Sequence, residues 1–192
     1  MNLDNYTMVI TGLGGQGLIR LLQILGHALV TQGYKVISSE THGLSQRGGK
    51  VTCFLRFGSK LNAPIPMIGT ADMIIALEES SILEVLKYAK PDKSTKLVVS
   101  SYEKQILDAD YPSLKYILNV LLGISDFIYF IPTMEIAVKY IGSLKTINSV
   151  LLGYVLKFLP LNKEVLEESI SSNFSGKTLE LNLNAFNEGF RL

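Results

Sequence analysis

Four glycines crowd the segment TGLGGQGLIR, which joins an apolar run to a pattern typical of a helix. Gly12, Gly14 and Gly17 have the spacing G-x-G-x-x-G, in which glycine permits a tight turn and a close approach of the backbone to a phosphate. Free N–H groups at the start of the following helix favour a bound anion. The pattern predicts a phosphate-binding turn, although the same glycines would also let a helix pack closely on a sheet.

An acidic residue belongs about 20 positions beyond such a turn when the ligand is a dinucleotide, because its carboxylate binds the ribose. Glu40 satisfies that spacing, and Gln16 and Arg20 add polar side chains near the turn. The extra glycine at Gly15 and a long polar loop before the next strand are unusual for an NAD site. The dinucleotide interpretation therefore stays open at this point.

A second polar segment, residues 39–50, has the sequence SETHGLSQRGGK and is expected to form a loop. Arg47 beside Gly48 and Gly49 would present a guanidinium group and open backbone N–H groups to an anion. In the alternative interpretation this is a surface loop whose Arg47 pairs with Glu40. We expect the loop to lie at the same edge of the sheet as the glycine turn, because both follow strand ends.

Other residues that could carry chemistry have plainer explanations. His27 lies among apolar neighbours on the first helix and is expected to be a packing residue. Cys53 falls within a predicted strand and is expected in the core. Glu78 and Glu79 follow a strand end, where α/β sites collect, or they simply begin a helix. A helix cap and a partner contact both remain open for three residues of one segment, Lys145, Thr146 and Asn148.

The elements that must position these residues alternate between strand and helix. Apolar, β-branched runs predict strands at residues 6–11, 34–38, 51–57, 73–77, 96–101 and 127–131. Helical spacing predicts helices at about 18–32 and 79–88, within 113–122, through much of 133–173 with breaks near Gly142 and Pro160, and at 183–190.

The first strand, turn, helix and second strand form a predicted βαβ unit. The alternation predicts one Rossmann-like, three-layer α/β domain over residues 1–192, with a largely parallel sheet and a helical C-terminal part.

Composition limits the classes of function. With 47% hydrophobic and 18% charged residues, the chain is apolar enough that part of its surface is expected to be buried against another chain. A net charge of +1 without a Lys/Arg cluster argues against nucleic-acid binding. A single cysteine excludes an internal disulfide and a cysteine-ligated cluster or zinc site, and we expect no metal site. No apolar run reaches about 18 residues, so the expected location is the cytoplasm, with no membrane contact.

GLGGQG followed by SETHGLSQRGGKVTCFLRFG resembles the gamma subunit, or gamma domain, of the 2-oxoacid:ferredoxin oxidoreductases. Among these, the chain most resembles the beta subunit of indolepyruvate:ferredoxin oxidoreductase. The resemblance continues at ADMIIALE, at KTINSVLLGYVLKFLP and at ELNLNAFNEGF. It implies a complex that oxidatively decarboxylates a 2-oxoacid on thiamine diphosphate, passes electrons through iron–sulfur clusters to ferredoxin and transfers the acyl group to coenzyme A.

For this chain the resemblance implies the role of a smaller subunit in a hetero-oligomer. A larger partner would supply thiamine diphosphate, magnesium and the iron–sulfur clusters, because this chain has one cysteine and lacks a G-D-G stretch with a following asparagine. We assign no catalytic residue. Coenzyme A is the first expected ligand and the partner's thiamine diphosphate the second. The candidate contacts are Gly12, Gly14, Gly15, Gln16, Gly17, Glu40, Thr41, His42, Ser45, Gln46, Arg47, Gly48 and Gly49.

Two functions from other classes remain as alternatives. One is a stand-alone NAD-dependent dehydrogenase of the Rossmann type, and the other is a nucleotide-binding regulatory module without chemistry. Whether His42 donates a proton or a hydrogen bond near a substrate carboxylate also stays open.

Overall fold

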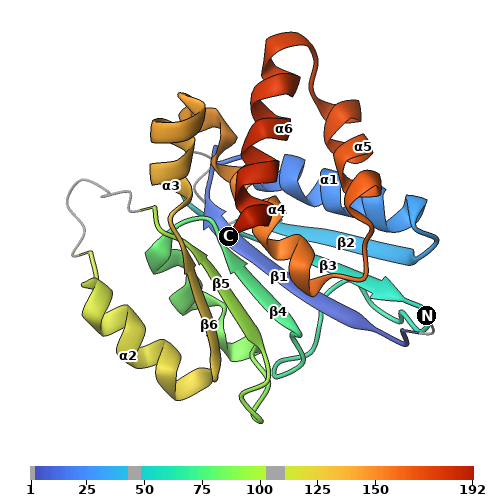
Figure 1. The fold of residues 1–192 in the computed structure, drawn as a ribbon. Helices are drawn as coiled ribbons and strands as arrows, with labels where there is room; N and C mark the ends of the chain where they lie inside the picture. The colour runs from blue at the N-terminus through green and yellow to red at the C-terminus, as the bar shows by residue number, and fades with distance from the viewer. Residues whose placement is uncertain (1–2, 43–48, 103–110) are drawn as a thin grey trace.

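A six-stranded sheet is the centre of the computed structural model, which describes residues 3–42, 49–102 and 111–192 (Figure 1). Its order is β2-β3-β1-β4-β5-β6. β1, β4, β5 and β6 are parallel, whereas β3 is antiparallel to both of its neighbours, so β2 runs in the same direction as β1. The strands are β1 (Tyr6–Leu13), β2 (Lys35–His42), β3 (Lys50–Gly58), β4 (Met73–Ala76), β5 (Lys96–Ser100) and β6 (Phe127–Ile131). The carboxyl ends of five strands therefore meet at one edge.

The position of β3 corrects two expectations. β1 and β2 were expected to form a βαβ unit, but β3 lies between them and pairs with both. The loop expected at residues 39–50 is also shorter, because β2 continues to His42. Glu40 is paired with Cys53 and Thr41 with Thr52, so the ladder with β3 holds this part of the segment in extended form.

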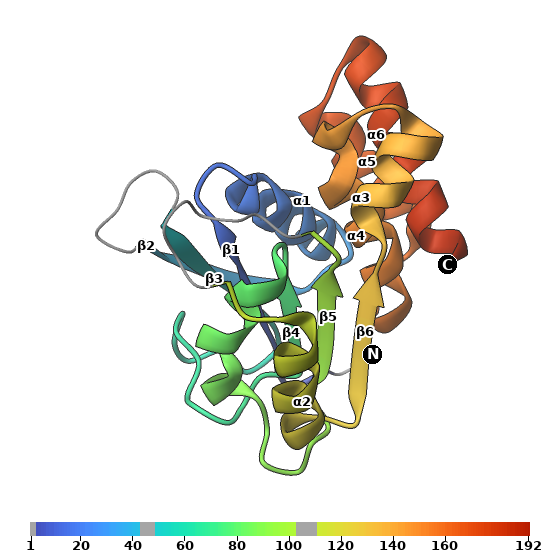
Figure 2. The ribbon, with the colours of Figure 1, turned by 90° about the vertical axis from the view of Figure 1, so that its left-hand side faces the viewer.

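Helices cover both faces of the sheet, as Figures 1 and 2 show from two directions. One face carries α1 (Leu18–Thr31), α4 (Ile147–Val155), α5 (Lys163–Asn173) and α6 (Gly176–Arg191). The other carries α2 (Leu114–Ile124) and two short 3-10 helices, η1 (Glu79–Glu84) and η2 (Leu86–Tyr88). Met8 and Ile10 of β1 pack on the first side and Val9 on the second, as the alternation of a strand requires. The predicted three-layer α/β fold is confirmed.

The helical predictions are confirmed in part. The break expected near Gly142 is present, where α3 (Thr133–Ile136) and a π-helical turn, η3 (Ala137–Ile141), end at a left-handed glycine with φ 76°. Two more 3-10 turns flank α4, η4 (Leu144–Thr146) and η5 (Leu156–Phe158). The last helix is longer than predicted, since α6 begins at Gly176. In the described ranges no helix combines the length and the apolar character needed to span a membrane.

The α-helix expected at residues 79–88 is instead the pair η1 and η2. The carboxylate of Glu78 accepts hydrogen bonds from the backbone N–H groups of Ser80 and Ser81, at 3.1 and 3.0 Å. The Ser81 hydroxyl donates to the Glu78 carbonyl oxygen at 2.6 Å. Such local bonds between side chains and backbone compete with the α-helical ladder.

The crossing of α4 and α6 depends on two glycines. A Cβ atom at Gly153 would lie 2.0 Å from the Phe186 carbonyl oxygen, and one at Gly189 would lie 1.9 Å from the Val150 carbonyl oxygen. Both obstacles are backbone atoms, which a rotamer change cannot move away. The two helices therefore reach their observed separation only because both positions lack a side chain.

Replacing Gly153 by alanine is expected to lower the melting temperature of the chain by roughly 6–12 °C. Overpacking costs up to about 3 kcal/mol, and each kcal/mol shifts the melting temperature of a chain of this size by about 2–4 °C. Calorimetry measures the change.

Gly123→Ala in α2 is the matched control, because nothing lies within 4 Å of its added Cβ. It should leave the stability unchanged or raise it by up to about 1 kcal/mol. Equal melting temperatures for Gly153→Ala and Gly123→Ala would contradict the close-packed crossing.

Candidate functional site

The glycine turn connects β1 to α1 at the carboxyl edge of the sheet. Gly15 and Gly17 have φ angles of 92° and 81°, in the left-handed region that glycine adopts without strain. Gly17 is the N-cap of α1 and offers no capping side chain. The first N–H groups of α1 therefore lack partners within the helix, and together with the helix dipole they suit a bound anion.

The Gln16 side chain, which was expected to add polar reach near the turn, lines the cleft and makes two hydrogen bonds within the protein. Its Oε1 accepts from the Leu13 N–H at 2.6 Å, and its Nε2 donates to the Leu77 carbonyl oxygen at 3.3 Å. A Cβ at Gly12 would lie only 2.6 Å from that Oε1. The residue thus joins the end of β1 to the segment that follows β4, and Gly12 leaves the space for it.

The backbone of Gln16 is bonded as well. Its N–H donates to the Leu13 carbonyl oxygen at 3.1 Å. Its carbonyl oxygen accepts from Nδ2 of Asn148, on α4, at 2.7 Å. Asn148 is a site residue whose role the sequence left open between a cap and a partner contact. The contact crosses from the C-terminal helices to the turn, and no local pattern in the sequence reveals it.

The polar segment before β3 meets the glycine turn. The Gly14 N–H donates to the Gly49 carbonyl oxygen at 2.8 Å. For Gly49, this contact confirms the prediction that the two segments share an edge of the sheet. The candidates Ser45, Gln46, Arg47 and Gly48 lie outside the described residues, as does the side chain of His42.

Glu40 and Thr41 lie on β2, separated from β1 by β3. Neighbouring strands are about 4.8 Å apart, so the backbone of Glu40 is about 10 Å from β1. The Thr41 hydroxyl donates to the Thr52 carbonyl oxygen at 3.2 Å. A dinucleotide site needs the acid on the strand beside the glycine turn. This topology therefore does not favour the NAD-dependent alternative.

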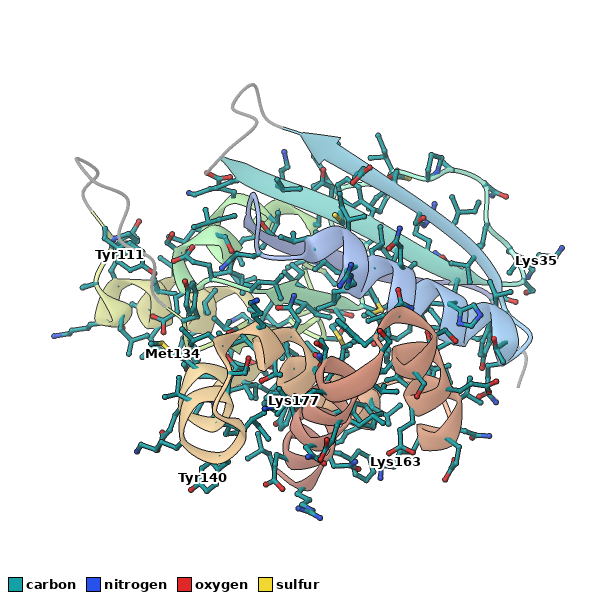
Figure 3. The ribbon with its side chains drawn as sticks, turned by 90° about the horizontal axis from the view of Figure 1, so that it is seen from above. Lys35, Tyr111, Met134, Tyr140, Lys163 and Lys177 are labelled. Carbon is teal, nitrogen blue, oxygen red and sulfur yellow. The ribbon has the colours of Figure 1, made fainter. Side chains whose placement is uncertain are left out.

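A cleft of about 800 Å³ opens beside the turn, between α1 and the C-terminal helices. Figure 3, seen from above, shows α1 lying alongside those helices across the sheet. Arg20 and Lys145 bring positive charge to the lining. The Arg20 guanidinium carbon lies 5.2 Å from the ring centroid of Phe174. Apolar and polar side chains that complete the lining include Ile19, Leu144, Tyr102, Ser149, Thr178 and Asn182.

The other acidic candidate has a structural role. Glu78 is fully buried and caps η1. Besides the two backbone N–H groups, its carboxylate accepts from the Ser80 hydroxyl at 2.8 Å and from the Tyr111 hydroxyl. Burial, followed by this bond to the carboxylate, raises the pKa of Tyr111. The polar contacts of Glu78 are thus explained by the protein itself.

Cys53 occupies the core position expected of it, whereas His27 is exposed on α1 rather than packed in the core. The Ser169 hydroxyl donates to the Ile24 carbonyl oxygen at 2.8 Å, so the His27 Nδ1 at 3.2 Å donates to Ser169 and joins α1 to α5. Cys53 is fully buried in β3. Burial, helped by the charge of Glu40, raises the pKa of its thiol to about 11.

The glycines of the turn should differ in their response to alanine. In Gly12→Ala the new Cβ would displace the Gln16 amide, so we expect a loss of about 1–3 kcal/mol in unfolding free energy. Gly15→Ala meets nothing within 4 Å and should cost only the backbone strain of about 1–2 kcal/mol. Crystal structures of both variants would test the cause. A Gln16 amide that keeps its bonds in Gly12→Ala would refute the steric explanation.

Comparison with known proteins places this geometry in a family. Residues 7–192 match the family model described as pyruvate ferredoxin/flavodoxin oxidoreductase. A curated relative, indolepyruvate oxidoreductase subunit IorB of Archaeoglobus fulgidus, is 34% identical over 95% of this chain and 92% of its own length. The common gamma subunit of the pyruvate/ketoisovalerate oxidoreductases of Pyrococcus furiosus is 29% identical over 93% and 92%.

Solved structures share the fold. A keto/oxoacid ferredoxin oxidoreductase gamma subunit from Geobacter sulfurreducens has a TM-score of 0.71 and 22% identity, over 98% of this chain and 96% of that one. A 2-oxoglutarate:ferredoxin oxidoreductase from Magnetococcus marinus, solved with 2-oxoglutarate, coenzyme A and succinyl-CoA bound, has a TM-score of 0.76 and 22% identity. The match covers 98% of this chain but only 31% of that one. The chain thus belongs to the pyruvate ferredoxin/flavodoxin oxidoreductase family, as a gamma-type subunit of a 2-oxoacid:ferredoxin oxidoreductase.

Proposed function

We propose that this chain is the smaller subunit of an indolepyruvate-type oxidoreductase and that its cleft binds coenzyme A for the complex. Four curated relatives named indolepyruvate oxidoreductase subunit IorB are 30–34% identical to it. The relatives named for pyruvate and ketoisovalerate are 28–29% identical. This difference supports an arylpyruvate substrate. As in the sequence-based expectation, the chain forms one domain and works in the cytoplasm.

The observation that carries the proposal is the cleft beside the glycine turn. It combines the N–H groups at the start of α1, which have no partner within the helix, with two cationic side chains, Arg20 and Lys145. Backbone N–H groups and cations together suit a phosphate-bearing ligand. Ile19 and Leu144, exposed at 45% and 53%, add apolar surface for the uncharged parts of a long molecule.

Each part of the cleft has a distinct task in this proposal. The turn and the first turn of α1 hold a phosphate, while Arg20 and Lys145 neutralise its charge. The ring of Phe174, also in the lining, contacts the Arg20 guanidinium and helps to hold it there. Coenzyme A supplies the thiol that accepts the acyl group. Nothing in this arrangement requires a side chain of this chain to take part in bond making.

The redox groups fit the partner subunit better than this chain. Cys53, the single cysteine, is buried, and its raised pKa keeps the thiol protonated. Within the described ranges no group of three His, Cys, Asp or Glu side chains could hold a metal ion. We therefore propose that thiamine diphosphate, magnesium and the iron–sulfur clusters reside on a larger subunit, from which electrons pass to ferredoxin.

The isolated chain is expected to be colourless and inactive, because it has no ligands for an iron–sulfur cluster. The measurement is an absorption spectrum together with an assay containing an arylpyruvate, coenzyme A, thiamine diphosphate and an artificial electron acceptor. The co-purified complex, assayed in parallel, should be coloured and active. Turnover by the single chain would refute the assignment as a subunit.

Removing the positive charge of the cleft should weaken the use of coenzyme A. In the complex, Arg20→Ala and Lys145→Ala are each expected to raise the KM for coenzyme A about tenfold, the lower end of what a charge-assisted hydrogen bond supplies. Arg47→Ala, predicted from the sequence, should act in the same direction by about ten- to a hundredfold. All three should melt close to the wild-type temperature, because surface substitutions usually cost within about 0.5 kcal/mol.

Lys157→Ala removes the same charge from η5, away from the lining of the cleft, and serves as the control. Its KM for coenzyme A should equal that of the wild type. The apparent affinity for thiamine diphosphate is measured in every variant. If the cleft substitutions lower the apparent affinity for thiamine diphosphate and leave the KM for coenzyme A unchanged, the assignment of coenzyme A to the cleft is wrong.

A further inference from the structure

We infer that Asn148 is a positioning residue of the glycine turn, and that through it the C-terminal helices fix the direction of the backbone donor at Gly17. The contact between Asn148 and the turn is independent of any ligand. Its consequence for coenzyme A rests on the proposed function. Sequence patterns left the role of Asn148 open between a helix cap and a partner contact, and it lies in one of the segments that resemble the family, KTINSVLLGYVLKFLP.

The geometry of one peptide unit carries the inference. Asn148 Nδ2 donates to the Gln16 carbonyl oxygen at 2.7 Å across a sequence separation of 132 residues. That carbonyl and the Gly17 N–H belong to the same planar trans peptide, in which the two groups point in opposite directions. Holding the oxygen against α4 therefore aims the Gly17 N–H the other way.

Asn148 also lies close against the turn itself. A Cβ at Gly17 would stand 3.1 Å from Asn148 Nδ2, so the amide group fills the space beside the left-handed residue. Gly17 has φ 81°, and a glycine in this conformation could rotate if the neighbouring carbonyl were free. The Asn148 bond supplies a restraint that the glycines of the turn do not supply themselves.

The helices behind Asn148 form a rigid support. The next residue, Ser149, is buried and donates its hydroxyl hydrogen to Oδ1 of Asn182 on α6 at 2.6 Å. Asn182 is also buried, and its Nδ2 donates to the Thr178 carbonyl oxygen at 2.8 Å. One turn further along α4, Gly153 makes the close crossing with α6. A linked series of contacts therefore runs from α6 through α4 to the turn.

The test uses the full chain, labelled with ¹⁵N, in wild-type form and as Asn148→Ala and Asn148→Asp. Aspartate keeps the size of the side chain, but its carboxylate cannot donate to the Gln16 carbonyl. Asn187→Ala is the matched control, because the Asn187 amide donates to its own helix, at the Leu183 carbonyl oxygen. Relaxation measurements give the order parameters of the Gly15 and Gly17 N–H groups, and melting curves report folding.

Both Asn148 variants should remain folded, with melting temperatures lower by about 2–4 °C. The Gly17 order parameter should fall from the rigid value of about 0.85 toward 0.6 or below, while the Asn187→Ala variant keeps the wild-type value. If one Asn148 variant fails to fold, the other supplies the measurement. If the amide chemical shifts and the order parameters of Gly15 and Gly17 keep their wild-type values in a folded Asn148 variant, the inference is wrong.

A kinetic measurement in the complex separates this inference from the proposed function. When Asn148 is replaced, the Gly17 N–H loses its fixed direction. The KM for coenzyme A should then rise about three- to tenfold, with kcat at saturating coenzyme A nearly unchanged. A mobile turn together with an unaltered KM would uphold the positioning role of Asn148. The same result would count against coenzyme A as the ligand of the cleft.

Discussion

The amide group of Gln16 is the contact on which the arrangement of the site depends. Through its Oε1 and Nε2 atoms it joins the end of β1 to Leu77, directly after β4. These two strands are parallel neighbours in the middle of the sheet. The side chain of Gln16 thus adds to the backbone hydrogen bonds of the turn, from Gln16 to Leu13 and from Leu77 to Thr11. Gly12 is required because any side chain there would meet that amide.

The remainder of the site is built outward from this contact. Gly14 binds the backbone of Gly49, which brings the segment before β3 to the turn. Asn148, on α4, donates to the Gln16 carbonyl oxygen. The turn is therefore restrained by the sheet, by the segment before β3 and by the C-terminal helices. Such preorganised backbone donors bind an anion without first losing conformational freedom. This property suits a subunit whose proposed task is to bind a ligand for the complex.

The sequence predicted the parts of the fold that local patterns specify. Apolar, β-branched runs located all six strands, and the glycine turn preceded α1 as expected. The direction of β3 was not predictable from its pattern, because the alternation of Val51, Cys53 and Leu55 is the same in parallel and antiparallel pairing. The unpredicted place of β3 between β1 and β2 matters for function. It separates Glu40 from the glycine turn, so Glu40 no longer fits the role of the acid that binds the ribose of a dinucleotide.

For the site, the sequence predicted the backbone turn but not the roles of the side chains around it. Glycine spacing indicated the anion-binding turn, but side-chain roles depend on contacts between distant segments. Gln16 looked like a ligand residue, yet its partners Leu77 and Asn148 lie 61 and 132 positions away. Glu78 looked like half of an acidic pair at a strand end, yet nearby hydroxyl and N–H groups use its carboxylate.

A structure of the native complex with coenzyme A, determined by cryo-electron microscopy, would show directly whether the cleft binds this ligand. We expect a phosphate of coenzyme A within hydrogen-bonding distance of the backbone N–H groups at Gly15 to Leu18, with Arg20 and Lys145 beside it. Coenzyme A bound wholly by the partner subunit, with the cleft of this chain filled by partner side chains, would contradict the proposed function.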